Sequence, residues 1–176
     1  DNIYAYAQYV TMLGEKASLV LGTGAKVFVV NDGLNTLSYV KNLSTLRLNY
    51  KINKKMSLSA VASLSPSLPS LGSLSTVMQR TDDVSANVGN ADLKPYNTLS
   101  GRLQFNYNAP KIFYATATAG YSHSFNPIVY TYYYNPELNL FVNSPHNSDY
   151  YKTMYLYTKI GAKKLFDFLY ISLTGN

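Results

Sequence analysis

The chain has 176 residues, a formal net charge of +6, no cysteine and 14% charged residues. An average soluble domain carries about 25% charged residues, so Ser, Thr, Asn and the 18 tyrosines supply most of the polarity here. The lack of cysteine excludes disulfides and thiolate–metal sites. The lysines and arginines are scattered and form no basic stripe, which nucleic-acid binding requires, so we expect no nucleic-acid partner.

The predicted elements are β-strands, because apolar and polar residues alternate with a period of two. In the stretch 44–52, for example, Leu46, Leu48 and Tyr50 alternate with polar residues. No stretch has a helical period, and none approaches the roughly 20 apolar residues of a membrane helix. In chain order, the expected strands are Ile3–Val10, Ala17–Val30, Ser44–Ile52, Met56–Leu64, Thr98–Tyr107, Phe113–Ser122, Tyr150–Gly161 and Phe166–Thr174. The expected fold is all-β, an antiparallel meander of about eight strands.

Short and long connections alternate between these strands. Short turns are expected near residues 12–15, 53–55, 108–111 and 162–165, whereas the segments 31–43, 65–96 and 125–149 are long. An outer-membrane barrel has short periplasmic turns and longer extracellular loops. Both ends of the chain then fall on the long-loop side, and the last residue is not aromatic. We therefore expect residues 1–176 to be one partial β-barrel domain, a fragment of a larger transmembrane barrel.

The surroundings of the longest connection resemble a known family. The stretch from Gly89 to Tyr96 (GNADLKPY) is similar to the GNPxLKPE motif of TonB-dependent outer-membrane receptors. Its matching residues are Gly89, Asn90, Leu93, Lys94 and Pro95, and its Tyr variant resembles the Bacteroidetes branch, an outer-membrane β-barrel family. The stretches 4–9 (YAYAQY) and 46–53 (LRLNYKIN) also resemble that family, in the family's order.

The resemblance implies a receptor in the bacterial outer membrane that imports a scarce nutrient, such as a siderophore, cobalamin or a glycan, with energy from TonB. Such receptors have a barrel of about 22 strands that is plugged by an N-terminal domain, and a short box that contacts TonB. Neither the plug, the box nor the closing strands are recognisable in this sequence. TonB and a plug are therefore implied partners only through other parts of a longer protein.

The alternation also predicts which side chains face which partner. The apolar rows would face outer-membrane lipid, and Arg47, Lys51, Arg102 and Gln104 would face the barrel lumen. The unpaired edges of an incomplete barrel would favour self-association.

An aromatic segment follows Asn126-Pro127 in the last long connection. Flat rings stack on sugars or hydrophobic ligands, so a small-molecule or glycan platform is one hypothesis. The favoured hypothesis is that two strands extend above the membrane and that their tyrosines pack together. The candidate ligand-binding residues are Tyr130, Tyr132, Tyr133, Tyr134 and Phe141.

No motif supports catalysis, a cofactor or a metal site. His123 and His146 are the only histidines, and no further ligands stand at useful spacing. The acidic stretch from Asp82 to Asp92 does not follow the EF-hand spacing. Serines are abundant, but there is no Gly-x-Ser-x-Gly elbow. We therefore expect a protein that is not an enzyme.

Two alternatives remain open. A complete small outer-membrane barrel with a structural or adhesive role would pair its first strand with its last. A soluble β-sandwich that binds carbohydrate through the tyrosine-rich connection would pack Leu46, Leu48 and Tyr50 against a second sheet.

Overall fold

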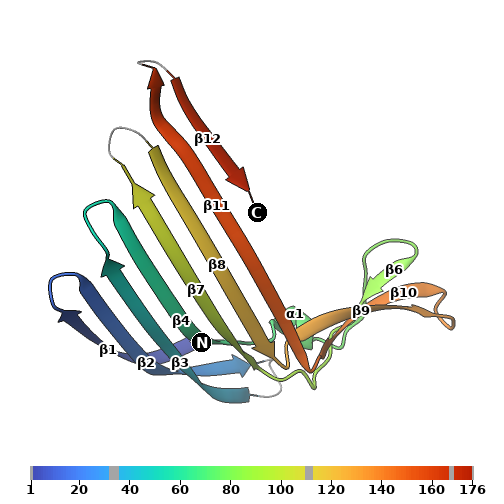
Figure 1. The fold of residues 1–176 in the computed structure, drawn as a ribbon. Coiled ribbons are helices and arrows are strands. Elements are labelled where there is room, and N and C mark those ends of the chain that lie inside the picture. The colour runs from blue at the N-terminus through green and yellow to red at the C-terminus, as the bar shows by residue number, and fades with distance from the viewer. Residues whose placement is uncertain (1, 32–35, 110–112, 167–168, 176) are drawn as a thin grey trace.

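A computed structural model describes residues 2–31, 36–109, 113–166 and 169–175, and the fold is nearly all-β. Eight strands form one antiparallel sheet in the order β1-β2-β3-β4-β7-β8-β11-β12 (Figure 1). Their bounds are Asn2–Leu13, Ala17–Asn31, Thr36–Lys51, Met56–Ser67, Tyr96–Asn108, Phe113–Phe125, Tyr150–Phe166 and Leu169–Gly175. The expected antiparallel meander of about eight strands is confirmed, because each predicted stretch overlaps its own strand of the large sheet.

Two predicted connections are wrong because the strands are longer than their apolar alternation suggests. The segment 31–43 is mostly β3, which pairs with β2 from Thr36 opposite Asn31 onward. Residues 162–165 belong to β11, and the link from β11 to β12 lies outside the described residues. Backbone pairing needs no apolar side chains, so polar residues extend a strand that alternation alone would end. The short turns at residues 14–16 and 52–55 agree with the prediction.

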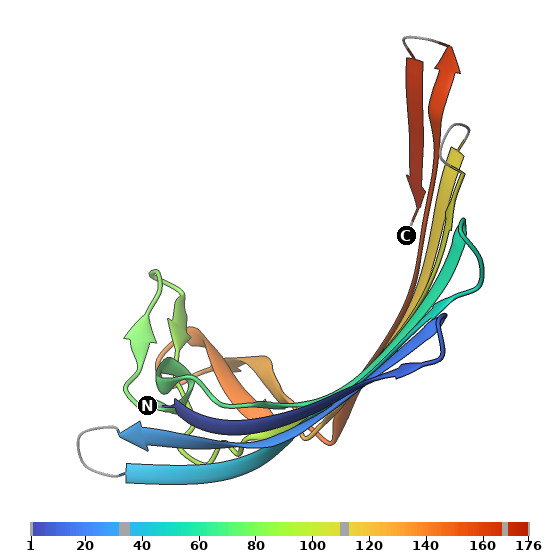
Figure 2. The same cartoon turned by 90° about the vertical axis from the view of Figure 1, so that its left-hand side faces the viewer.

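The two longest connections together form a second, four-stranded sheet, which the sequence analysis did not predict. Its order is β5-β6-β10-β9, with bounds Gln79–Arg80, Ser85–Asn87, Leu140–Asn147 and Ile128–Asn135. The pairing of β6 with β10 is parallel and joins residues 85–87 to residues 141–143. This second sheet lies at the end of the large sheet that is opposite the short turns (Figure 1). It is on the concave side of the large sheet (Figure 2).

One short helix, α1 (Leu71–Leu74), precedes this second sheet. Its first turn is capped by the Ser70 hydroxyl, which accepts a hydrogen bond of 3.1 Å from the Ser73 amide. Within the part of the chain that the structure describes, no helix is long and apolar enough to cross a membrane.

The register places apolar and polar side chains on opposite faces of the large sheet. Adjacent residues of a strand point to opposite faces, so paired residues across the sheet form rows that belong to one face. One row comprises Leu48, Ala60, Leu103 and Ala119, and the next comprises Asn49, Ser59, Gln104 and Thr118. We call these sides the apolar face and the polar face.

Hydroxyl and amide groups on the polar face bond to one another across the strands. Ser59 donates to the Asn49 Oδ1 at 3.0 Å, and Asn49 donates through Nδ2 to the Ser18 hydroxyl at 3.3 Å. The Ser63 and Ser100 hydroxyls are 2.8 Å apart. These short polar side chains satisfy one another on the face that carries them.

In the described part of the chain, large side chains on the apolar face are exposed. Leu46, Leu48 and Tyr50 are 43%, 37% and 41% exposed, so the packing that a β-sandwich predicts is not found at these residues. The strands β1 and β12 lie at opposite edges of the sheet and do not pair, unlike the first and last strands of a closed small barrel. Fully buried side chains gather instead around the second sheet, where Val142, Ala86 and Leu93 are at most 2% exposed.

Candidate ligand-binding surface

The family-like motif forms the junction between the two long segments. The amides of Gly89 and Asn90 donate to the carbonyl oxygens of Ser75 and Ser73, at 2.8 and 2.7 Å. The side chain of Asn90 donates through Nδ2 to the Pro145 carbonyl at 3.2 Å. Leu93 is buried beside them. The motif thus has a clear structural role, because it binds the segment before β7 to the segment that contains β10.

Asn147 completes this junction. Its Oδ1 accepts from the Lys94 amide at 2.8 Å, and its Nδ2 donates to the carbonyls of Lys94 and Asn126 at 3.0 and 2.8 Å. Asn126 itself has a positive φ of 54°, a conformation that asparagine tolerates better than most residues. One side chain therefore holds together three segments that are far apart in the sequence.

Replacing Asn147 by alanine is expected to destabilise the junction by about 1–2 kcal/mol, because three hydrogen bonds are lost and the Lys94 amide is left without its partner. Amide-proton exchange at Lys94 should become faster while exchange in the strands of the large sheet is unchanged. The control is Asn42→Ala, an exposed asparagine on β3. Equal exchange at Lys94 in both variants would contradict this role of Asn147.

Four of the five candidate aromatic residues share one face of the second sheet. In β9, Tyr130, Tyr132 and Tyr134 alternate with residues of the opposite face, and Phe141 of β10 is paired with Tyr134. The Phe141 ring is stacked on the Tyr132 ring with centroids 5.7 Å apart, and it is tilted against the Tyr134 ring at 5.3 Å. We call these four residues the aromatic ladder.

Tyr133 does not belong to the aromatic ladder. It alternates with Tyr132 and Tyr134, and its partner is the buried Val142. The hairpin of β9 and β10 belongs to the second sheet, but it continues the pairing of β8 with β11 in the same register. The amides of Asn126 and Ser148 donate to the carbonyl oxygens of Asp149 and Pro127 and bridge the two ladders, as the expected extension of two strands requires. Packing between the tyrosines and Phe141 is present, and the exposed outer surfaces of the rings also leave a platform.

A pocket of about 280 Å³ adjoins the ladder at Tyr130. Side chains of four segments line it, and the polar ones are Ser70, Ser73, Gln79, Asn87 and Asn143. The Tyr130 hydroxyl is 3.0 Å from the Ser73 hydroxyl. These amide and hydroxyl residues could not be predicted from the sequence, because only the long-range pairing of β6 with β10 brings them to the tyrosines.

The four residues that were expected to face the lumen share the polar face. Arg47 and Arg102 are both paired with Val61, and Lys51 and Gln104 fall on the same face of their strands. Gln104 donates through Nε2 to the Asn106 Oδ1 at 3.0 Å. The structure therefore brings these residues to one side of the sheet.

The histidines and acidic residues are separate from one another. The His123 ring is stacked on Phe125 with centroids 4.3 Å apart, and His146 Nδ1 is 3.1 Å from the Thr131 hydroxyl. Asp82 accepts a hydrogen bond from the Val84 amide. In the described part of the chain, no group of three His, Asp or Glu residues could hold a metal ion.

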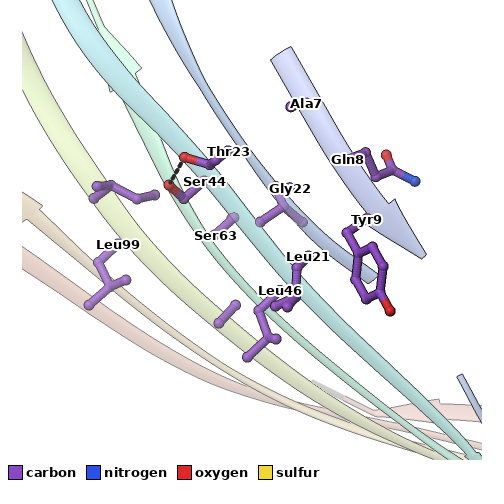
Figure 3. A pocket seen from close by; sticks show the side chains of 13 residues that line it. Ala7, Gln8, Tyr9, Leu21, Gly22, Thr23, Ser44, Leu46, Ser63 and Leu99 are labelled. Atoms are coloured by element: carbon purple, nitrogen blue, oxygen red, sulfur yellow. Dashed lines mark hydrogen bonds between the residues drawn. The ribbon is translucent and has the colours of Figure 1, made fainter. Parts of the chain in front are cut away.

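An apolar depression of about 570 Å³ lies on the large sheet and crosses β1, β2, β3, β4 and β7 (Figure 3). The large apolar side chains in its lining are those of Tyr9, Leu21, Leu46, Leu64 and Leu99. Among the residues that the structure describes, no charged one lines it, and the hydroxyls of Thr23 and Ser44 are 3.3 Å apart, so each has a partner. Such a surface suits hydrocarbon and not a polar ligand.

Solved structures with a similar fold include receptors and transporters. The hemophore receptor HasR of Serratia marcescens, in complex with its hemophore HasA and heme, has a TM-score of 0.79 and 13% identity over 98% of this chain and 33% of its own. The siderophore receptor PirA of Acinetobacter baumannii has a TM-score of 0.66 and 13% identity, over 93% of this chain and 26% of its own. The FrpB iron transporter of Neisseria meningitidis has a TM-score of 0.66 and 16% identity, over 93% of this chain and 23% of its own.

This chain thus spans about a quarter to a third of the length of these proteins. At such low identity the likeness shows the fold alone, and it confirms the predicted resemblance to part of the barrel of TonB-dependent receptors. Among curated proteins, none matches the sequence. The family model that matches residues 2–176 describes an "Outer membrane protein beta-barrel family". The expected localisation in the bacterial outer membrane is confirmed by this match, and the chain belongs to the outer membrane protein beta-barrel family.

Proposed function

We propose that this chain is part of the barrel wall and of the extracellular surface of a TonB-dependent nutrient transporter. One observation carries the proposal. The large sheet has one apolar and one polar face, short turns at one end, and the whole second sheet at the other end (Figure 1). This asymmetry is typical of outer-membrane barrels, whose periplasmic turns are short and whose extracellular loops are long.

In this proposal the apolar face contacts lipid and the polar face lines the lumen. Leucine rows and the apolar depression would meet acyl chains, since in the described part of the chain the lining of the depression holds no charged residue. Arg47, Lys51, Arg102 and Gln104 would contact a plug domain or a passing solute. The role is transport and not catalysis.

The substrate of the transporter would be a scarce nutrient such as a siderophore, cobalamin or a glycan. The similar structures are those of a siderophore receptor, an iron transporter and a hemophore receptor, so the fold is compatible with several kinds of cargo. The choice between them has to come from the surface that a nutrient meets first, which is the second sheet.

The proposal is tested by reading the open reading frame on both sides of these codons. We expect a plug-like domain with a TonB-contacting box upstream and further alternating strands downstream that complete a barrel of about 22 strands. A frame that encodes only a signal peptide before Asp1 and a stop after Asn176 would contradict the transporter and favour a small barrel.

A further inference from the structure

We propose that the aromatic ladder and the adjoining pocket bind a neutral saccharide chain. This inference rests on the proposed function and names the nutrient class that this surface would capture. The first support is the arrangement of the rings. Tyr130, Tyr132 and Tyr134 recur at every second residue of β9, which spaces them by about 7 Å along the strand. A linear ligand that lies along β9 would contact the three rings in succession.

The exposure of the rings supports binding. Tyr132 is 58% exposed although Phe141 is stacked against it, with only 6° between the ring planes. Aromatic rings offer a flat apolar surface with a hydroxyl at the edge. The C–H face of a sugar ring matches the flat surface, and its hydroxyl groups match polar partners around the edge.

Those polar partners stand in one row across the second sheet. Gln79 of β5 is paired with Asn87 of β6, Asn87 with Asn143 of β10, and Asn143 with Tyr132 of β9. Asn143 donates through Nδ2 to the Asn87 Oδ1 at 3.1 Å, and Asn87 donates to the Thr81 hydroxyl at 3.1 Å. The row ends at a ring of the ladder, so amides and aromatic surface are adjacent.

Part of this row remains available for a ligand. Within the described residues, neither the side-chain amide of Gln79 nor the Oδ1 of Asn143 takes part in a hydrogen bond. An amide offers both donors and acceptors, as a sugar hydroxyl requires. The pocket itself is smaller than the roughly 300–1,000 Å³ that encloses a drug-sized ligand, so it would hold about one ring and not a macrocycle.

The absence of charged side chains from the pocket lining in the described part of the chain favours an uncharged ligand over an anionic one. No Lys, Arg, His, Asp or Glu belongs to the lining of the pocket in the described part of the chain. The nearest arginine in sequence, Arg80, follows Gln79 in β5 and so falls on the opposite face. An anionic ferric catecholate would require cationic partners, whereas an uncharged polyhydroxyl chain would not. The neutral saccharide is therefore the ligand class that this chemistry fits.

The test is binding of defined oligosaccharides to the full-length protein, purified from the outer membrane in detergent. The probes are maltoheptaose, cellohexaose, mannohexaose, xylohexaose and inulin, with a ferric tris-catecholate as the anionic probe. We expect at least one neutral oligosaccharide to bind at millimolar concentration or below. Replacing Tyr132 by alanine should weaken this binding about tenfold, as expected for the loss of one stacking ring.

The matched control is Tyr133→Ala, the next residue of the same strand, whose ring lies on the other face and is 45% exposed. It should change the dissociation constant by less than about twofold. Gln79→Ala, at the edge of the sheet, is a variant that should fold normally. It should weaken binding about threefold, since one hydrogen bond to the ligand is lost.

Different results would contradict the saccharide site and the transporter proposal. Absence of binding by every neutral probe, binding of the ferric tris-catecholate at this surface, or equal effects of Tyr132→Ala and Tyr133→Ala would each overturn the saccharide site. If a saccharide binds as expected but enters cells equally well without TonB, the site stands and the transporter proposal fails.

Discussion

Replacing Leu103 by arginine is expected to lower the free energy of unfolding in a lipid bilayer by about 2–4 kcal/mol. Leu103 lies in the middle of β7, on the apolar face, and is paired with Ala60 and Ala119. A charged side chain at this depth of the bilayer loses its hydration, and the small alanines beside it offer no partner. Denaturant unfolding of the full-length protein in liposomes measures the difference.

The control for this substitution is Gln104→Arg, one residue further along the same strand but on the polar face. In a water-filled or plug-lined lumen an arginine stays hydrated, so the stability should change by less than about 0.5 kcal/mol. If both variants lost the same free energy of unfolding, the apolar face would not be the lipid-facing one and the polar face would not line the lumen. The proposed orientation of the large sheet would then be wrong.

Replacing Gly89 by alanine is expected to destabilise the junction by about 1–3 kcal/mol, as overpacking does in other proteins. A Cβ atom at Gly89 would lie less than 3.0 Å from the carbonyl oxygens of Gly72, Ser73 and Ser75. Backbone oxygens cannot rotate away as a flexible side chain can, so α1 would have to move. Limited proteolysis should then cut the segment between β4 and β7 faster than in the unchanged protein.

Gly72→Ala is the control for this prediction. Gly72 lies in α1 itself, and apart from its chain neighbours and the backbone of α1, a Cβ atom there would have no described heavy atom within 4 Å. Alanine favours a helix over glycine by up to about 1 kcal/mol, so the proteolysis rate should stay the same or decrease. If Gly89→Ala is cut no faster than Gly72→Ala, the motif glycine is not required for close backbone approach.

Much of the large sheet could be predicted from the sequence, because the pattern that specifies each strand lies within a few neighbouring residues. The alternation of Leu46, Leu48 and Tyr50 with polar residues sets both the strand and the face of each residue. The strands of an antiparallel meander follow one another across the sheet in chain order, so sequence order predicts spatial order. The ends of the strands were harder to predict, as the polar start of β3 at Thr36 shows, because backbone pairing continues where the apolar pattern stops.

The candidate site depended on contacts that no local pattern encodes. The aromatic segment is recognisable from the sequence as a platform, and alternation along β9 separates Tyr133 from Tyr132. Only the pairing of β9 with β10 places Phe141 against the tyrosines. The Gly89 to Tyr96 stretch was recognised by resemblance, and its hydrogen bonds to residues of the β10 segment give the physical reason for the motif.

The sequence by itself thus determined the strands of the large sheet, their antiparallel order and the division into an apolar and a polar face, since a period of two acts over a few neighbouring residues. The tertiary structure alone decided that two long connections join as a second sheet and that Gln79, Asn87 and Asn143 meet Tyr132. The parallel pairing of β6 with β10 closes a loop of more than 50 residues. Closing such a loop depends on the sum of many weak contacts along the junction and not on any short pattern of residues.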